Sequence, residues 1–160
     1  MKNIVFTRID DRLIHGQVMT AWIQYTQATE VVIVDNQVAK DSFSIMIMKN
    51  VIPPKITLNI LDEESAADYL KKEPSNVNEK TFILVKTPMP VLSLVEKGVK
   101  IKSVGIGGMG ARRDRKPFYK NISANEQEID VMKNLGRKGV KVFIQIIPDN
   151  EPINLKDIVK

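Results

Sequence analysis

One short stretch of the chain gathers most of the side chains that could do chemistry. His15 is the only histidine in 160 residues, and it lies in RIDDRLIHGQV with two arginines, two aspartates and a glycine. The guanidinium groups of Arg8 and Arg12 suit the geometry of phosphate oxygens. Gly16 and Gln17 stand at the start of a helical pattern, where free N–H groups favour an anion. Because imidazole is largely neutral and nucleophilic near pH 7, the stretch predicts a histidine that itself accepts a phosphoryl group.

The two aspartates of this stretch are candidates for orienting the imidazole. Asp10 or Asp11 could bond the ring nitrogen that does not react, and either could equally cap the following helix. We expect the capping role for at least one of them. A single histidine in a sequence most often has no catalytic or ligand-binding role. His15, however, follows an apolar strand pattern and precedes a glycine, where backbone can approach a ligand closely, and this position favours a function.

The composition is that of a globular protein. Hydrophobic residues make up 43% and charged residues 27%, and no apolar run approaches the roughly 20 residues that span a bilayer. Charge appears too early at the N-terminus for a secretory signal, so we expect a soluble, cytoplasmic protein of one domain, residues 1–160. Cysteine is absent and histidine is single, which argues against a metal site.

The net charge of +5 does not by itself select a partner. The basic residues are scattered and aromatic residues are only 6% of the chain, so the sequence does not indicate nucleic-acid binding. An acidic protein partner or a phosphorylated group fits this charge equally well.

Strand and helix patterns alternate along the whole chain. This alternation predicts an α/β fold with an open, mostly parallel, twisted sheet and helices on both faces. Six strands are expected at Asn3–Ile9, Glu30–Asp35, Lys55–Leu61, Thr81–Thr87, Lys100–Ile106 and Val140–Ile147. Helices are expected at Gln17–Gln27, Asp41–Val51, Asp62–Lys72, Met89–Lys97 and Ala124–Lys138. The segment Pro117–Ile122 leaves no room for a helix and predicts a short antiparallel strand, and Ser123 with Glu126 predicts a capping box for the last helix.

Ligands of open α/β sheets bind beyond the carboxyl ends of the strands, and two loops are expected there. One is Asp10–Gly16, and the other is the glycine-rich GIGGMGARRDRK, Gly105–Lys116. The second loop matches the spacing G-x-G-x-x-G of dinucleotide sites, but the residues after the last glycine form no apolar stripe and include a proline, so the pattern is weak. The alternatives are a tight turn that needs glycine, or a loop whose Gly107 and Gly108 border the histidine site.

The basic residues of this second loop are expected to form a solvated turn. They are Arg112, Arg113, Arg115 and Lys116. A second interpretation is that some of them meet the acidic rim of a partner protein.

The stretch RIDDRLIHGQV, followed by Thr20 and Trp22, resembles the N-terminal signature of the enzyme IIB components of the mannose/fructose/sorbose class of the bacterial phosphotransferase system. The similarity continues through VVIVDNQVAKD, LVKTPMPVLSLVEKGVKIKSVGIGGM and GVKVFIQIIP, and so covers essentially the whole chain. One departure is Gly105, which stands where the family's Asn-Val-Gly-Gly-Met stretch has its asparagine.

The resemblance implies a cytoplasmic phosphotransferase that commonly forms a homodimer and works beside the membrane permease. Its histidine, matching His15, would accept a phosphoryl group from a phosphohistidine of a IIA domain and pass it to a sugar held by the membrane IIC and IID components. The family's active-loop arginine matches Arg12. No metal, nucleotide or other cofactor and no nucleic acid is implied.

The residues and the resemblance together lead to three hypotheses. The first is a phosphocarrier for a hexose such as mannose, fructose or sorbose, or for an amino sugar. The second is a nucleotide-binding module built on GIGGMG. The third is a regulatory docking protein in which phosphorylation of His15 changes the choice of partner without onward transfer to a sugar.

Overall fold

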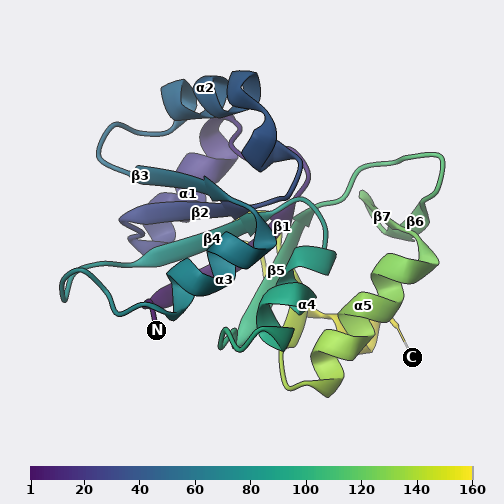
Figure 1. The fold of residues 1–160 in the computed structure, drawn as a ribbon. Coiled ribbons are helices and arrows are strands. Elements are labelled where there is room, and N and C mark those ends of the chain that lie inside the picture. The colour runs from purple at the N-terminus through teal and green to yellow at the C-terminus, as the bar shows by residue number, and fades with distance from the viewer. Residues whose placement is uncertain (160) are drawn as a thin grey trace.

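The computed structural model describes residues 1–159 and consists of a central sheet covered by helices on both faces (Figure 1). The strands are β1 (Ile4–Asp10), β2 (Glu30–Val34), β3 (Thr57–Leu61), β4 (Thr81–Val85), β5 (Ser103–Gly108), β6 (Lys116–Tyr119), β7 (Ile122–Ala124), β8 (Lys141–Ile144) and β9 (Ile153–Asn154). The helices are α1 (Gly16–Thr26), α2 (Ser42–Val51), α3 (Glu63–Lys71), α4 (Met89–Glu96) and α5 (Glu126–Arg137), with short 3-10 turns η1 (Val38–Lys40) and η2 (Leu155–Asp157).

The main sheet has the strand order β3-β2-β4-β1-β5-β8-β9. All neighbouring pairs are parallel except β8 with β9. The prediction of an open, mostly parallel α/β sheet is therefore confirmed. β1 lies between β4 and β5, while the chain that leaves β1 runs through α1 to β2 on one side of it. The end of β1 is thus near the point where the strand order reverses, which is where open α/β sheets bind their ligands.

Both faces of the sheet are buried, and successive residues of a strand serve opposite faces. In β2, Val31 and Ile33 pack in the core under α1 and α2, together with Trp22 of α1. Val32 and Val34 pack in the core under α3, α4 and α5. Figure 1 shows the two helix layers on either side of the sheet. This double burial explains why the strand sequences are nearly continuous runs of Val, Ile and Leu.

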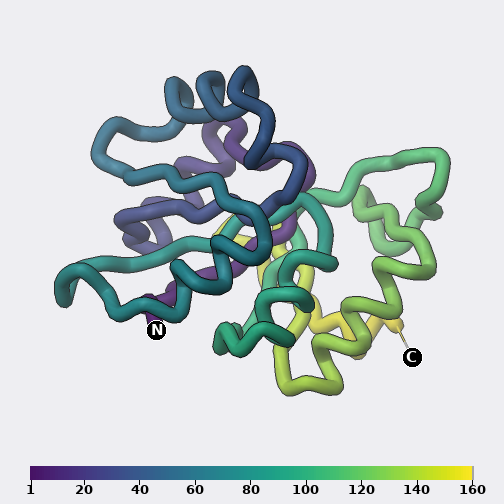
Figure 2. The backbone as a smooth tube through the Cα atoms, in the orientation of Figure 1, coloured from purple at the N-terminus to yellow at the C-terminus, as the bar shows by residue number. Residues whose placement is uncertain are grey.

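The segment Pro117–Ile122 is not one strand but most of a hairpin. β6 and β7 pair antiparallel in a separate two-stranded sheet, and the turn between them places Lys120 at φ 46°. Figure 2 shows this hairpin standing apart from the main sheet, and the two ends of the chain well separated. The antiparallel strand of the main sheet is instead β9, whose two residues are too few for the sequence to indicate a strand.

The capping box of α5 was predicted two residues too early. Its N-cap is Asn125, whose side chain accepts from the N–H of Glu128 while the Glu128 carboxylate accepts from the N–H of Asn125. Ser123 lies in β7 and donates its N–H to Met109. Among residues 1–159, no helix is both long enough and apolar enough to cross a membrane.

Candidate functional site

His15 lies between the end of β1 and the start of α1. The chain turns back after Asp10, with the N–H of Leu13 donating to the Asp10 carbonyl at 3.0 Å and Leu13 itself at φ 56°. His15 is the N-cap residue of α1, in an extended conformation, and Gly16 follows at φ 46°, a region that favours glycine. The imidazole is partly exposed, with 22% of the side chain accessible. The loop therefore presents the histidine at the carboxyl edge of the sheet.

Asp10 is the residue that holds the imidazole. Its Oδ2 lies 3.0 Å from Nε2 of His15, and its carboxylate is fully buried. Burial raises the pKa of the Asp10 carboxyl, but hydrogen bonds from Arg12 and His15 outweigh burial, and the pKa lies below its usual value. Of the two orienting candidates, the structure brings Asp10 and not Asp11 to the ring.

Arg12 folds back over the same carboxylate and remains half exposed. Its Nε donates to Oδ1 of Asp10 at 3.1 Å and its Nη2 to Oδ2 at 3.2 Å, while its backbone N–H also donates to Oδ1. The Arg12 side chain is 52% exposed. A cationic group thus stands beside His15 with donors still open to solvent.

The expectation that Arg8 would contact a phosphate is not met, because its guanidinium is fully buried. It donates to the carbonyls of Gln145 and Ile146, each at 2.9 Å, and it lies 4.9 Å from the centre of the Trp22 ring. Its contact with Asp10 is long, at 3.4 Å, and its Nε has no partner among residues 1–159. Burial lowers the pKa of Arg8 to about 10. Arg8 supports Asp10 from beneath the loop.

The two glycines of the second loop, Gly107 and Gly108, belong to β5 and not to a loop. The register between β1 and β5 shifts there, since Ile9 pairs with Ile106 but Asp10 with Gly108. A Cβ on Gly107 would collide with the guanidinium of Arg8, and one on Gly108 would lie 2.6 Å from Oδ1 of Asp10. These glycines make room for the two buried side chains that support His15.

Gly105 faces a different neighbourhood. A Cβ there would lie 3.0 Å from the rings of Phe6 and Phe143, which fill the space beside this glycine. β5 leads through residues 109–115 into β6, and no helix follows the glycines. The arrangement lacks the helix N-terminus that a dinucleotide fingerprint requires.

Asp11 caps no helix, contrary to one of our expectations. Neither aspartate caps α1, which has no side-chain cap at all. Asp11 Oδ2 instead accepts from the N–H of Gly110 at 2.8 Å and from Nη1 of Arg115 at 3.2 Å. Because α1 is uncapped, the N–H groups of its first residues, Gly16 and Gln17, have no helical acceptor and remain available to an anion.

Arg115 is buried, so the prediction of a wholly solvated basic turn was wrong for this residue. Its Nε and Nη2 donate to the two carboxylate oxygens of Glu128 at 2.9 and 2.7 Å. Burial alone would lower the pKa of Arg115, but the bonds to Glu128 and Asp11 raise it. Arg112, Arg113 and Lys116 are exposed, as expected. Sequence reasoning missed this pair, although the spacing N-x-x-E at 125–128 marks Glu128 as an inward-facing capping residue.

Residues 1–159 contain no group of three or more histidine, cysteine, aspartate and glutamate side chains that could hold a metal ion. The cluster of one imidazole, one buried carboxylate and one half-exposed arginine has instead the composition of a site for an anionic group.

The fold and the histidine loop define a class of α/β proteins, and comparison with known proteins identifies the family. Residues 4–160 match the family of the PTS system sorbose subfamily IIB component. The chain belongs to this family, as its sequence predicts. The PTS system fructose-specific EIIB component of Bacillus subtilis is 31% identical over 160 residues, which is 100% of this chain and 98% of that protein.

A solved structure agrees with this assignment. The IIBSor domain of the sorbose permease from Klebsiella pneumoniae superimposes with a TM-score of 0.92 at 32% identity, covering 98% of this chain and 96% of that one. The PTS system mannose-specific EIIAB component of Escherichia coli is 31% identical over 98% of this chain. The present chain spans about half the length of that relative, 48% of it.

Proposed function

We propose that this protein is a phosphocarrier of a sugar-transporting phosphotransferase system, and that His15 carries the phosphoryl group. The observation that supports this most directly is the 3.0 Å contact between Nε2 of His15 and the buried Asp10. A carboxylate at Nε2 keeps the proton on that nitrogen, so Nδ1 bears the lone pair. The partly exposed ring can then act as a nucleophile without any cofactor.

The transfer is a displacement at phosphorus. The lone pair of Nδ1 of His15 forms the new N–P bond as the N–P bond to a donor phosphohistidine breaks, and the donor imidazole leaves with that electron pair. The positive charge that develops on the ring of His15 is shared with Asp10 through the Nε2 proton. In the second transfer, a sugar hydroxyl attacks phosphorus, loses its proton to a base of the acceptor component, and Nδ1 leaves with its electrons.

The charges around the ring suit the transferring group. The half-exposed guanidinium of Arg12 and the uncapped N–H groups of Gly16 and Gln17 can meet phosphoryl oxygens. Such donors stabilise the charge spread over these oxygens in the transition state. Asp10 is a positioning residue in this scheme, and Arg8 holds Asp10 from below.

The partners are inferred from the family. We propose a IIA domain as phosphodonor, the membrane IIC and IID components as the site of the accepted hexose or amino sugar, and a cytoplasmic homodimer that associates peripherally with the permease. The sugars named for the relatives differ, being mannose, fructose and sorbose. We therefore assign the choice of sugar to the membrane components.

The test is labelling with a phosphorylated IIA domain carrying ³²P, followed as acid-labile, base-stable phosphate. We expect rapid labelling of the wild type, no labelling of His15→Gln, and transfer about 10- to 100-fold slower in Arg12→Ala, because one charged donor to the transferring group is lost. Arg137→Ala is the matched control, since Arg137 is also an exposed arginine but lies at the end of α5, outside the two loops that follow β1 and β5. Equal labelling of His15→Gln and wild type would contradict the proposal.

A further inference from the structure

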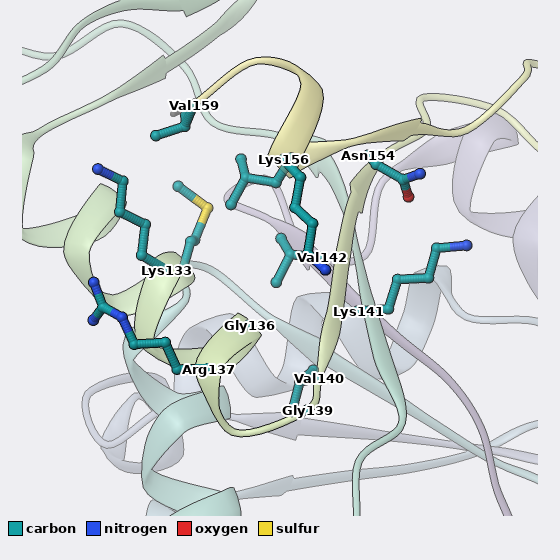
Figure 3. A pocket seen from close by; sticks show the side chains of 12 residues that line it. Lys133, Gly136, Arg137, Gly139, Val140, Lys141, Val142, Asn154, Lys156 and Val159 are labelled. Carbon is teal, nitrogen blue, oxygen red and sulfur yellow. The ribbon is translucent and has the colours of Figure 1, made fainter.

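A cavity of about 730 Å³ lies against α5, far along the chain from the histidine loop. Its floor is apolar and includes Met132 of α5, Val142 of β8 and Leu155 of η2. Figure 3 shows Lys133 and Arg137 projecting from α5 on one side and Lys156 coming from the C-terminal segment. The volume is within the range of small-molecule sites, and the mixture of an apolar floor with a few polar groups is typical of them.

The charged groups around this cavity are all positive. Lys133, Arg137, Lys141 and Lys156 line it, and no aspartate or glutamate does. None of these cations forms an ion pair or a side-chain hydrogen bond with another of residues 1–159. Three of the four, Arg137, Lys141 and Lys156, are exposed and so are accessible to a ligand. Unpaired cations around a low-dielectric wall concentrate a positive potential in the cavity.

A glycine in α5 forms part of the cavity wall. Gly136 lies in the last turn of α5 and lines the cavity. A Cβ at this position would meet nothing within 4 Å, so no packing contact of the protein requires glycine there. The backbone of α5 is therefore open to the cavity at this position, which leaves room for a ligand against it.

We infer that this cavity binds a small organic anion that carries an apolar group, with a phosphate or a carboxylate as its charge. The apolar part would lie on Met132, Val142 and Leu155, and the anionic part would meet Lys133, Arg137 and Lys156. The cavity is formed at the start of β8, whereas His15 follows the end of β1. Because the strands are parallel, the two sites lie at opposite ends of the strands. The ligand would therefore bind without displacing a phosphoryl group from His15.

The experiment is a titration of the ¹⁵N-labelled full chain, followed by amide chemical shifts. Phenyl phosphate and phenylacetate test the two kinds of charge, and inorganic phosphate and benzyl alcohol supply the charge and the apolar group separately. We expect saturable shifts in residues 136–142 and 154–159, with at least one aromatic anion binding about tenfold or more tighter than either separate probe. Whether phenyl phosphate or phenylacetate binds better identifies the charge.

Variants locate the site. The pair Lys133→Ala with Lys156→Ala should weaken binding about tenfold or more, whereas Lys49→Ala with Lys72→Ala, also exposed lysines but on other elements, should not. Gly136→Leu should abolish binding by filling the cavity, with the melting temperature unchanged or raised.

His15→Gln should bind the aromatic anions with the affinity of the wild type. This variant therefore tests the cavity independently of the proposed phosphocarrier function. Shifts confined to residues 12–18, equal binding of inorganic phosphate, or full affinity in Gly136→Leu would each overturn the inference.

Discussion

Two buried arginines flank the end of β1, and their surroundings differ sharply. Arg115 has a carboxylate partner at bidentate distance, Glu128 at 2.7 and 2.9 Å, and a further bond to Asp11. Arg8 is just as buried but has only a long, 3.4 Å contact with Asp10, and it relies on main-chain carbonyls for its other bonds. The pKa of Arg115 is raised by its partners, whereas burial lowers that of Arg8 to about 10.

The difference between the two arginines shows that Asp10 and Asp11 have different structural roles. Asp11 belongs to the well-paired cluster, where it ties the loop at Gly110 to α5 through Arg115. Asp10 has the underpaired arginine below it and gives its short contacts to Arg12 and His15 instead. A stable ion pair therefore anchors the loop, while the carboxylate of Asp10 is left with hydrogen-bonding capacity for the ring of His15.

The largest effect is expected when the shared carboxylate is lost. Asp10→Asn should destabilise the fold by about 3–5 kcal/mol, because Arg8 is fully buried and has no other carboxylate contact among residues 1–159. It should also slow phosphoryl transfer to His15 about 100-fold or more, since a neutral amide no longer holds the proton on Nε2 and can instead donate its own NH2 to that nitrogen. Urea denaturation and ³²P labelling measure the two effects, with Asp114→Asn as the exposed control.

The same variant has a defined pH dependence. The pKa of Asp10 is lowered in the folded protein, so its contribution to stability is present above the unfolded carboxyl value of about 3.9 and is lost as the pH falls through the folded value. The difference in the free energy of unfolding between wild type and Asp10→Asn should have its largest value near pH 7 and should decrease only below about pH 4. A gap that is constant down to pH 2 would mean that the charge of Asp10 is not what stabilises the site.

The next effect concerns stability alone. Arg115→Met should cost about 3 kcal/mol in the free energy of unfolding, because Glu128 stays fully buried without its bidentate partner. Labelling of His15 at a temperature well below the melting point should change little, since Arg115 touches neither the ring nor Arg12. Arg113→Met is the control, because Arg113 lies in the same turn and is exposed, and it forms no ion pair with Glu128. A large loss of transfer in a fully folded Arg115→Met protein would show that the anchor also sets the position of the histidine.

The sequence predicts the fold and the position of His15 between a strand and a helix, because both depend on local patterns. Apolar runs separated by helical segments are sufficient for the parallel sheet, and His15 is single and stands at a strand–helix junction. The alternation of strand residues also places Arg8 and Asp10 on one face, a signal that would have paired them. Arg115 is buried because it pairs with Glu128. The sequence analysis places the capping box of this helix two residues too early, at Ser123 and Glu126, and so does not identify Glu128 as an inward-facing residue.

The parts that the sequence does not predict depend on long-range register. The irregular pairing of β1 with β5 decides that Gly107 and Gly108 lie against Arg8 and Asp10, so glycines typical of a phosphate-binding loop instead make room for side chains. The burial of Arg8 depends on the carbonyls of Gln145 and Ile146, which are separated from it by 137 and 138 positions in the chain. No local pattern around Arg8 distinguishes such an arginine from one that contacts a phosphate.

The smallest effect is expected at Arg8 itself. Arg8→Met removes a buried cation that has no close carboxylate partner, so the relief of its desolvation offsets part of the two lost bonds to carbonyls, and the net cost should be about 1 kcal/mol. Asp10 keeps Arg12 and His15 as partners, and transfer should therefore fall much less than in Asp10→Asn. The measurement is urea denaturation of Arg8→Met beside Arg115→Met under the same conditions. If Arg8→Met proved the more destabilising of the two, the contrast between an underpaired and a well-paired arginine would be wrong, and Arg8 would be the stronger anchor of the loop.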